Sequence, residues 1–162
     1  MVRIHCNSGS DVDIDADTLV GANLAGLNLH RALLEKVDLR RANISRADLR
    51  SAWLDEAIME DADLSESLLP ACLARRARFA GANLTRALLR CGSFEGADFS
   101  RANLSGADLG FAELRGAILF GADVRALNLA DCVLTNALAD GETLWPHGFD
   151  PIAHGVRLQE SS

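Results

Sequence analysis

Side chains able to do chemistry are few in this sequence of 162 residues, and their spacing favours no reaction. Of the four histidines only His147 and His154 could approach each other, and no clear third ligand accompanies them. Gly-rich phosphate-binding motifs are absent. The four cysteines form no C-x-x-C pair and have no histidine at metal-ligand spacing: Cys6, Cys72, Cys91 and Cys132. The sequence therefore predicts no enzyme, no metal site and no cofactor.

Hydroxyl side chains recur every 20 residues, at Ser45, Ser65, Thr85 and Ser105. A nucleophilic hydroxyl needs a general base beside it, and no histidine accompanies these positions. We therefore interpret them as an exposed structural ladder. Such regular spacing points to a repeating architecture that positions these and all other side chains.

A period of five residues runs from Leu24 to Leu134. In these 23 pentads the central residue is large and apolar except at Ala74, and the residue two before it is alanine in 16. At the position two before the centre, the residues other than alanine are Leu27, Val37, Ser67, Cys72, Gly92, Leu127 and Cys132. Five residues of α-helix advance by about 500°, which would spread the leucines over every face, and a simple strand needs period two. Period five without a slip indicates a solenoid.

Units such as Ala22-Asn23-Leu24 and Ala47-Asp48-Leu49 resemble the A-(D/N)-L-x-x motif of pentapeptide-repeat proteins, over about residues 12–140. The resemblance implies an all-β fold, a right-handed quadrilateral parallel β-helix. Four pentads would form one coil, with the central residue and the one two before it pointing inward. Correlations at a spacing of 20 support this coil independently, and they predict that Phe79 stacks on Phe99. The expected core includes Leu24, Leu49, Phe79, Phe99 and Leu104.

We expect about six coils at residues 22–140, between an N-terminal cap with an irregular first coil at residues 1–21 and a C-terminal cap or tail at residues 141–162. Val2 and Ile4 alternate with polar residues before a turn, which favours a short hairpin. In the tail, Trp145 and Phe149 are interpreted as a plug over the open end, with a functional site as the alternative.

The net charge of −7 disfavours a protein that binds nucleic acid or an anionic membrane directly through a positive field. No apolar run is long enough to span a membrane, and the first residues lack the pattern of a signal peptide, so a cytoplasmic location is expected. Residues 1–21 carry −3 and residues 142–162 carry −2, which leaves the repeat nearly neutral.

Charge is nevertheless banded along the repeat. Residues 31–50 carry +3, residues 53–66 carry −6, residues 75–90 carry +5 and residues 91–141 carry −4. One interpretation is that neighbouring coils neutralise each other through surface ion pairs, which are individually weak. The other is a banded recognition surface. The acidic residues at issue are Asp55, Glu56, Glu60, Asp61, Asp63 and Glu66.

An apolar series is predicted on the outside of the rod. Leu33, Trp53 and Leu73 stand 20 residues apart at an outward position and should form a stripe on one face. Leu68 and Leu88 should form a shorter pair on the adjoining face. The stripe could bind a partner or form a homodimer, or it could be a tolerated feature of the surface.

Two functional hypotheses remain at this stage. The first is a rigid, non-catalytic scaffold that binds an unidentified protein. The second follows from the family resemblance: some members look like B-form DNA and bind type II topoisomerases such as DNA gyrase or topoisomerase IV, which they inhibit or protect from poisons. The near-neutral repeat, the basic bands and the lack of an obvious C-terminal dimerisation helix weigh against the second hypothesis.

Overall fold

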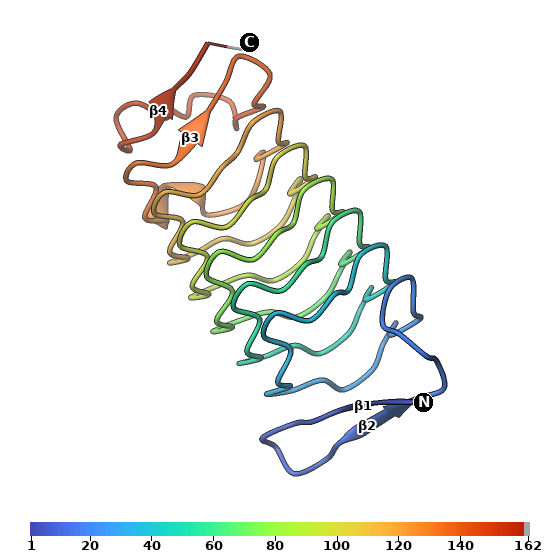
Figure 1. The fold of residues 1–162 in the computed structure, drawn as a ribbon. Helices are drawn as coiled ribbons and strands as arrows, with labels where there is room; N and C mark the ends of the chain where they lie inside the picture. The colour runs from blue at the N-terminus through green and yellow to red at the C-terminus, as the bar shows by residue number, and fades with distance from the viewer. Residues whose placement is uncertain (161–162) are drawn as a thin grey trace.

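The structure is a computed structural model that describes residues 1–160. It is an elongated rod with the chain termini at opposite ends (Figure 1). At the N-terminal end, β1 (Val2–Ile4) and β2 (Val12–Ile14) form an antiparallel hairpin in which Val2 is paired with Ile14. The hairpin joins the rod through an antiparallel bridge between Cys6 and Ala32.

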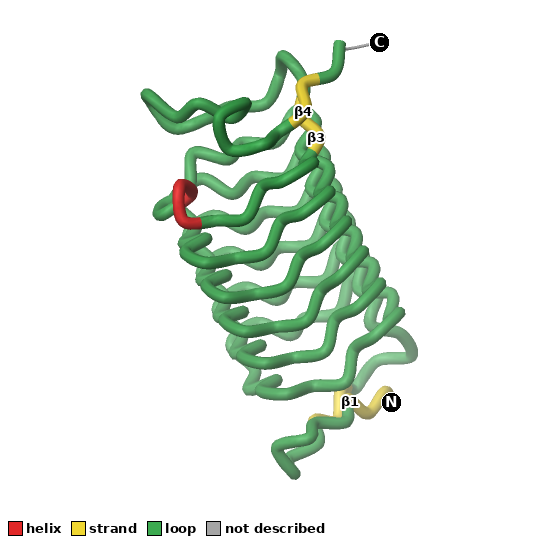
Figure 2. The backbone as a smooth tube through the Cα atoms, turned by 90° about the vertical axis from the view of Figure 1, so that its left-hand side faces the viewer, coloured by secondary structure: helices red, strands yellow, loops and turns green. Residues whose placement is uncertain are grey.

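The rod is a parallel solenoid whose successive coils pair residue by residue at a spacing of 20. The Leu24 amide donates to the Asn43 carbonyl at 2.7 Å, and the Asn43 amide donates to the Ala22 carbonyl at 2.9 Å. Equivalent bridges define four sides, which we name after their first members as the Asn23, Asn28, Leu33 and Asp38 faces. Each coil contributes only a short bridge to each face, so the tube in Figure 2 shows few regular strands.

Inside the rod, alanines and large apolar side chains fill a narrow lumen. Leu24, Leu49 and Leu104 are at most 1% exposed. Phe79 and Phe99 are fully buried and stack with ring centroids 4.8 Å apart, and Phe94 contacts both rings edge-on. Burying a large apolar side chain contributes about 1.5–3 kcal/mol, so the repeated inward positions dominate the stability of the rod.

The Asn or Asp of the motif, which directly precedes the central residue, forms hydrogen bonds at the corners of the coil. The Asn23 side-chain oxygen accepts a hydrogen bond from the Ala25 amide at 3.3 Å, and the Leu27 amide donates to the Leu24 carbonyl at 3.2 Å. The turn has a positive φ of 67° at Gly26, as a type II turn requires. Where Asn or Asp stands at this motif position, its side chain therefore helps to fix the chain direction at the corner through local hydrogen bonds.

The expectation of an unbroken period is wrong at residues 125–132. Leu127 bridges Asp108, a spacing of 19, and the frame is recovered when Val133 bridges Glu113. A 3₁₀ helix, η1 (Leu129–Asp131), takes up the extra residue between them. Leucine is larger than the alanine usually found at this inward position; here Ala126 is buried and Leu127 lies outside, 57% exposed.

At the C-terminal end, β3 (Leu138–Ala139) pairs in parallel with β4 (Arg157–Leu158). The segment between them carries a stack of rings, with Trp145 against Phe149 at 5.4 Å and Phe149 against His154 at 4.4 Å. Both predicted plug residues are half-buried and pack on the edge of the core. His154 is thus engaged in packing, and its Nδ1 lies 2.8 Å from the Asp150 carbonyl oxygen.

Candidate interaction surface

The reactive side chains lie apart from one another. Cys6, Cys72 and Cys132 are buried, and Cys91 is exposed. Burial raises the pKa of the Cys72 and Cys132 thiols to about 12, so both remain protonated at neutral pH. Within residues 1–160 no three His, Cys, Asp or Glu side chains are grouped to hold a metal ion. None of the helices described there is long and apolar enough to cross a membrane.

The charge bands meet each other across neighbouring coils. Glu66 of the acidic band lies between Arg46 and Arg86 of the two basic bands, with contacts of 3.1 and 2.6 Å. Further pairs join the same bands: Asp55 with Arg75 at 2.5 Å, Glu56 with Arg76 at 3.1 Å, and Glu60 with Arg78. This geometry favours the ion-pair interpretation of the bands.

The two remaining acidic candidates differ from these four. Asp63 accepts hydrogen bonds from the Ser65 amide at 3.0 Å and from the Asn83 side chain at 3.1 Å, so it stabilises a corner and its neighbouring coil. Asp61 is exposed, and no ion pair within residues 1–160 involves it. Its carboxylate occupies the space that a Cβ at Gly81 would need. The six acids are thus spread over several faces and corners, and most are neutralised.

The ion pairs of Glu66 with Arg46 and Arg86 predict that the stability of the protein depends on pH. Hydrogen bonds from Arg46, and then from Arg86, hold the pKa of Glu66 below its ordinary value. Since the folded pKa lies below the unfolded one, this contribution is present above the unfolded glutamate pKa of about 4.3 and is lost as the pH falls through the folded value. We expect the melting temperature to fall more steeply between neutral pH and about pH 3 in the wild type than in Glu66→Gln. Parallel melting curves from calorimetry would contradict this expectation.

The predicted apolar stripe is continuous on the Leu33 face. Leu33 bridges Trp53 and Trp53 bridges Leu73, so the three side chains stand on successive coils. Leu33 is half-buried, whereas Trp53 is 43% and Leu73 37% exposed. The next residues of the column are Ser93 and Glu113, which end the apolar stripe towards the C-terminal end.

Sequence reasoning missed apolar residues at one corner next to this face. The turn residues at positions 30–31, 50–51, 70–71, 90–91 and 110–111, which we call the Arg31 corner, include Pro70, Ala71 and Phe111. Phe111 is 59% exposed, has a positive φ of 59°, and lies under the Arg90 guanidinium at 5.7 Å. A spacing of 20 applied to the turn positions would have found this column.

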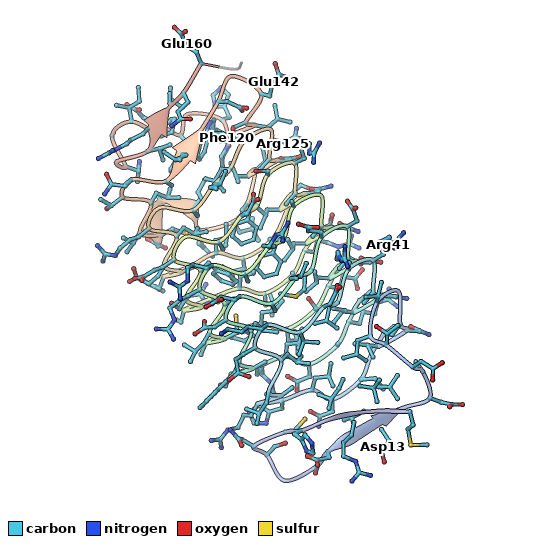
Figure 3. All side chains as sticks on the ribbon, viewed as in Figure 1. Asp13, Arg41, Phe120, Arg125, Glu142 and Glu160 are labelled. Carbon is cyan, nitrogen blue, oxygen red and sulfur yellow. The ribbon has the colours of Figure 1, made fainter. Side chains whose placement is uncertain are left out.

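Elsewhere the surface offers an open hollow near the C-terminal end. It has a volume of about 540 Å³ and is lined by Ser100, Arg101, Phe120, Asp140 and Glu142, together with Gly121. Figure 3 shows Phe120 and Glu142 at this end of the rod, with charged side chains pointing outward along its length. Asp140 is already used there, because its carboxylate accepts hydrogen bonds from the Gly121 and Glu142 amides.

Comparisons with known proteins agree with this geometry. The family model for pentapeptide repeats matches residues 19–55, 57–94, 82–121 and 97–136. The chain is 32% identical to alr5209, a pentapeptide repeat protein from Nostoc Pcc 7120, covering 72% of this chain and 84% of that one, with a TM-score of 0.31. The plasmid-mediated fluoroquinolone resistance protein QnrB1 is 14% identical, with 85% and 92% covered and a TM-score of 0.57. A comparison with curated proteins returned no match.

Proposed function

This chain belongs to the pentapeptide-repeat family, and from that premise we propose that it is a non-catalytic rod that binds another protein through its Leu33 face. The observation that supports the proposal most is the stripe of Leu33, Trp53 and Leu73. Aromatic and aliphatic side chains held on a rigid backbone lose little conformational entropy on binding, which makes them effective anchors. The family's closed, filled lumen leaves the outer faces as the functional part of the molecule. The stripe serves that purpose on this chain.

A DNA-mimic that binds a type II topoisomerase is the alternative function. It draws on the fold shared with QnrB1, a protein described as conferring fluoroquinolone resistance. Mimicry of DNA needs a continuous negative track, since duplex DNA carries one charge per about 1.7 Å of axis. In this chain the column of turn residues Arg46, Glu66 and Arg86 instead alternates in sign. Charge alternation therefore favours the apolar face as the binding surface.

The substitution Trp53→Glu tests the proposal. It should leave the circular dichroism spectrum and melting temperature nearly unchanged, because Trp53 is outside the core. The variant should lose its protein partner in a pull-down and show no complex in light scattering, because the substitution buries a charge in the middle of an apolar contact. Leu88→Glu is the matched control, with 39% exposure on the Asn28 face, and should retain binding. Unchanged binding in Trp53→Glu would contradict the proposal.

A gyrase supercoiling assay, with and without a fluoroquinolone, separates the two functions. The apolar-face proposal expects neither inhibition of supercoiling nor protection from the drug. Inhibition or protection that persists in Trp53→Glu would instead support the topoisomerase alternative, because it would not depend on the stripe.

A further inference from the structure

We propose that the partner bound by the Leu33 face is a second copy of this chain, aligned in parallel, with a two-fold axis that runs along the rods between the two faces. This inference rests on the proposed function and names the occupant of the same surface. In a two-fold interface each residue left of the axis meets the copy of a residue right of it at the same height. The column of residues on one side of the axis must therefore be complementary to the column on the other side.

The centre of the face fits such a pair. The Leu33, Trp53 and Leu73 column lies on the axis, so each apolar side chain packs beside its own copy. The bridges between coils place these residues on one parallel ladder, and two such ladders can pack face to face at about 10 Å. Glu113 would meet its own copy, so the contact ends at Ser93, where the apolar stripe also ends.

The two corners that border the face carry different charges. The Arg31 corner holds bases and neutral residues but no acid on any coil, and each coil is one level of the contact. The opposite border, which we call the Lys36 corner, comprises positions 35–36, 55–56, 75–76, 95–96 and 115–116, and it holds acids on three levels. The two-fold axis places one corner against the other. On every coil where basic side chains of the two copies would face each other, a carboxylate therefore lies at the same height.

Individual levels show this complementarity. Arg50 of one copy faces Asp55 and Glu56 of the second copy, and Arg90 faces Glu95 of the second copy. Within each copy Arg50 also pairs with Asp48, Asp55 with Arg75, Glu56 with Arg76 and Arg90 with Asp108, so contacts between the copies would add to existing ion pairs. The arginines of the third level, Arg75 and Arg76, face the neutral Pro70 and Ala71 of the second copy.

The level of Leu33 gives the sharpest indication. Arg31 and Glu35 flank Leu33 on its two sides, and within residues 1–160 neither takes part in an ion pair. Parallel alignment puts Arg31 of each copy against the Glu35–Lys36 turn of the other, so that Arg31 and Glu35 can pair twice across the contact. An antiparallel pair would instead place the basic Arg31 corner against itself, so complementarity selects the parallel arrangement.

Charge reversal tests the contact without disturbing an intramolecular pair. We expect a wild-type dimer in sedimentation equilibrium. Arg31→Glu and Glu35→Arg should each raise the dimer dissociation constant at least about tenfold, because each sets like charges together. The double variant Arg31→Glu/Glu35→Arg should return it near the wild-type value. A wild type that stays monomeric at millimolar concentration, or single variants that dimerise normally, would overturn the proposal.

Cysteine cross-linking tests the alignment, in a Cys91→Ser background that removes the exposed thiol. With a short bis-maleimide, Leu33→Cys alone and Leu73→Cys alone should each give covalent dimers, because each lies beside its own copy. Cross-linking only when the two variants are mixed would indicate an antiparallel pair and overturn the parallel alignment.

The two proposals fail in distinguishable ways. A monomeric wild type whose binding to another protein is lost in Trp53→Glu would refute the homodimer and leave the proposed function standing. A dimer that Trp53→Glu leaves intact would refute the homodimer through this face, and the proposed function would be refuted as well if binding to another protein were also unchanged in that variant.

Discussion

Phe99→Ala is expected to destabilise the protein by about 3–5 kcal/mol, the usual cost of removing a buried aromatic ring. Phe79, Phe94 and Phe99 are fully buried and form one stacked and two edge-on contacts inside the lumen. The surrounding backbone is held on all four sides by bridges to both neighbouring coils, so it cannot collapse into the cavity. The loss should be read from urea denaturation followed by circular dichroism.

Phe111→Ala provides the matched control, because it removes the same ring from a position that is 59% exposed. Its effect on the free energy of unfolding should stay within about 0.5 kcal/mol. Equal unfolding midpoints for the two variants would show that the phenylalanine cluster does not form the core of the rod.

Gly92→Ala is expected to destabilise the protein by about 1–3 kcal/mol, as overpacking of a filled core does. The repeat itself suggests the opposite, since alanine occupies 16 of the 23 equivalent positions. A Cβ at Gly92 would lie 2.5 Å from Phe94 Cε2 and 3.1 Å from the Leu89 carbonyl oxygen. The large ring at position 94 thus takes the space that alanine uses in other pentads. Calorimetric melting of the purified variant measures the effect.

A double-mutant cycle with Phe94→Leu isolates this contact. Because leucine frees the space beside Gly92, the double variant should lose less stability than the sum of the single losses. Gly141→Ala is the control, since a Cβ there meets nothing within 4 Å. It should be neutral or slightly stabilising, because it restricts the unfolded chain. A Gly92→Ala variant as stable as the wild type would contradict the clash.

The residues on the outside of the rod were harder to interpret from sequence than those inside. The stripe of Leu33, Trp53 and Leu73 was predictable, because a period of 20 places its members on one column. The pairing of Glu66 with Arg46 and Arg86 was one of two interpretations, since long charged side chains can extend in several directions from the same backbone position. Phe111 escaped notice because the turn positions vary most in residue type.

The sequence by itself determined the period of five, the inward and outward positions and the family of the chain, because each pentad repeats the same local hydrogen bonds and the same burial. The tertiary structure alone decided where the period fails and which charges meet. Leu127 leaves the frame, with Ala126 buried in its place, and a Cβ at Gly92 would clash with the ring of Phe94. The frame shift at Leu127 and the glycine at position 92 both depend on the space that neighbouring side chains leave, and the repeat pattern alone does not show that space. That Arg31 and Glu35 take part in no ion pair within residues 1–160 also follows only from the tertiary structure, which fixes the geometry of the surface charges.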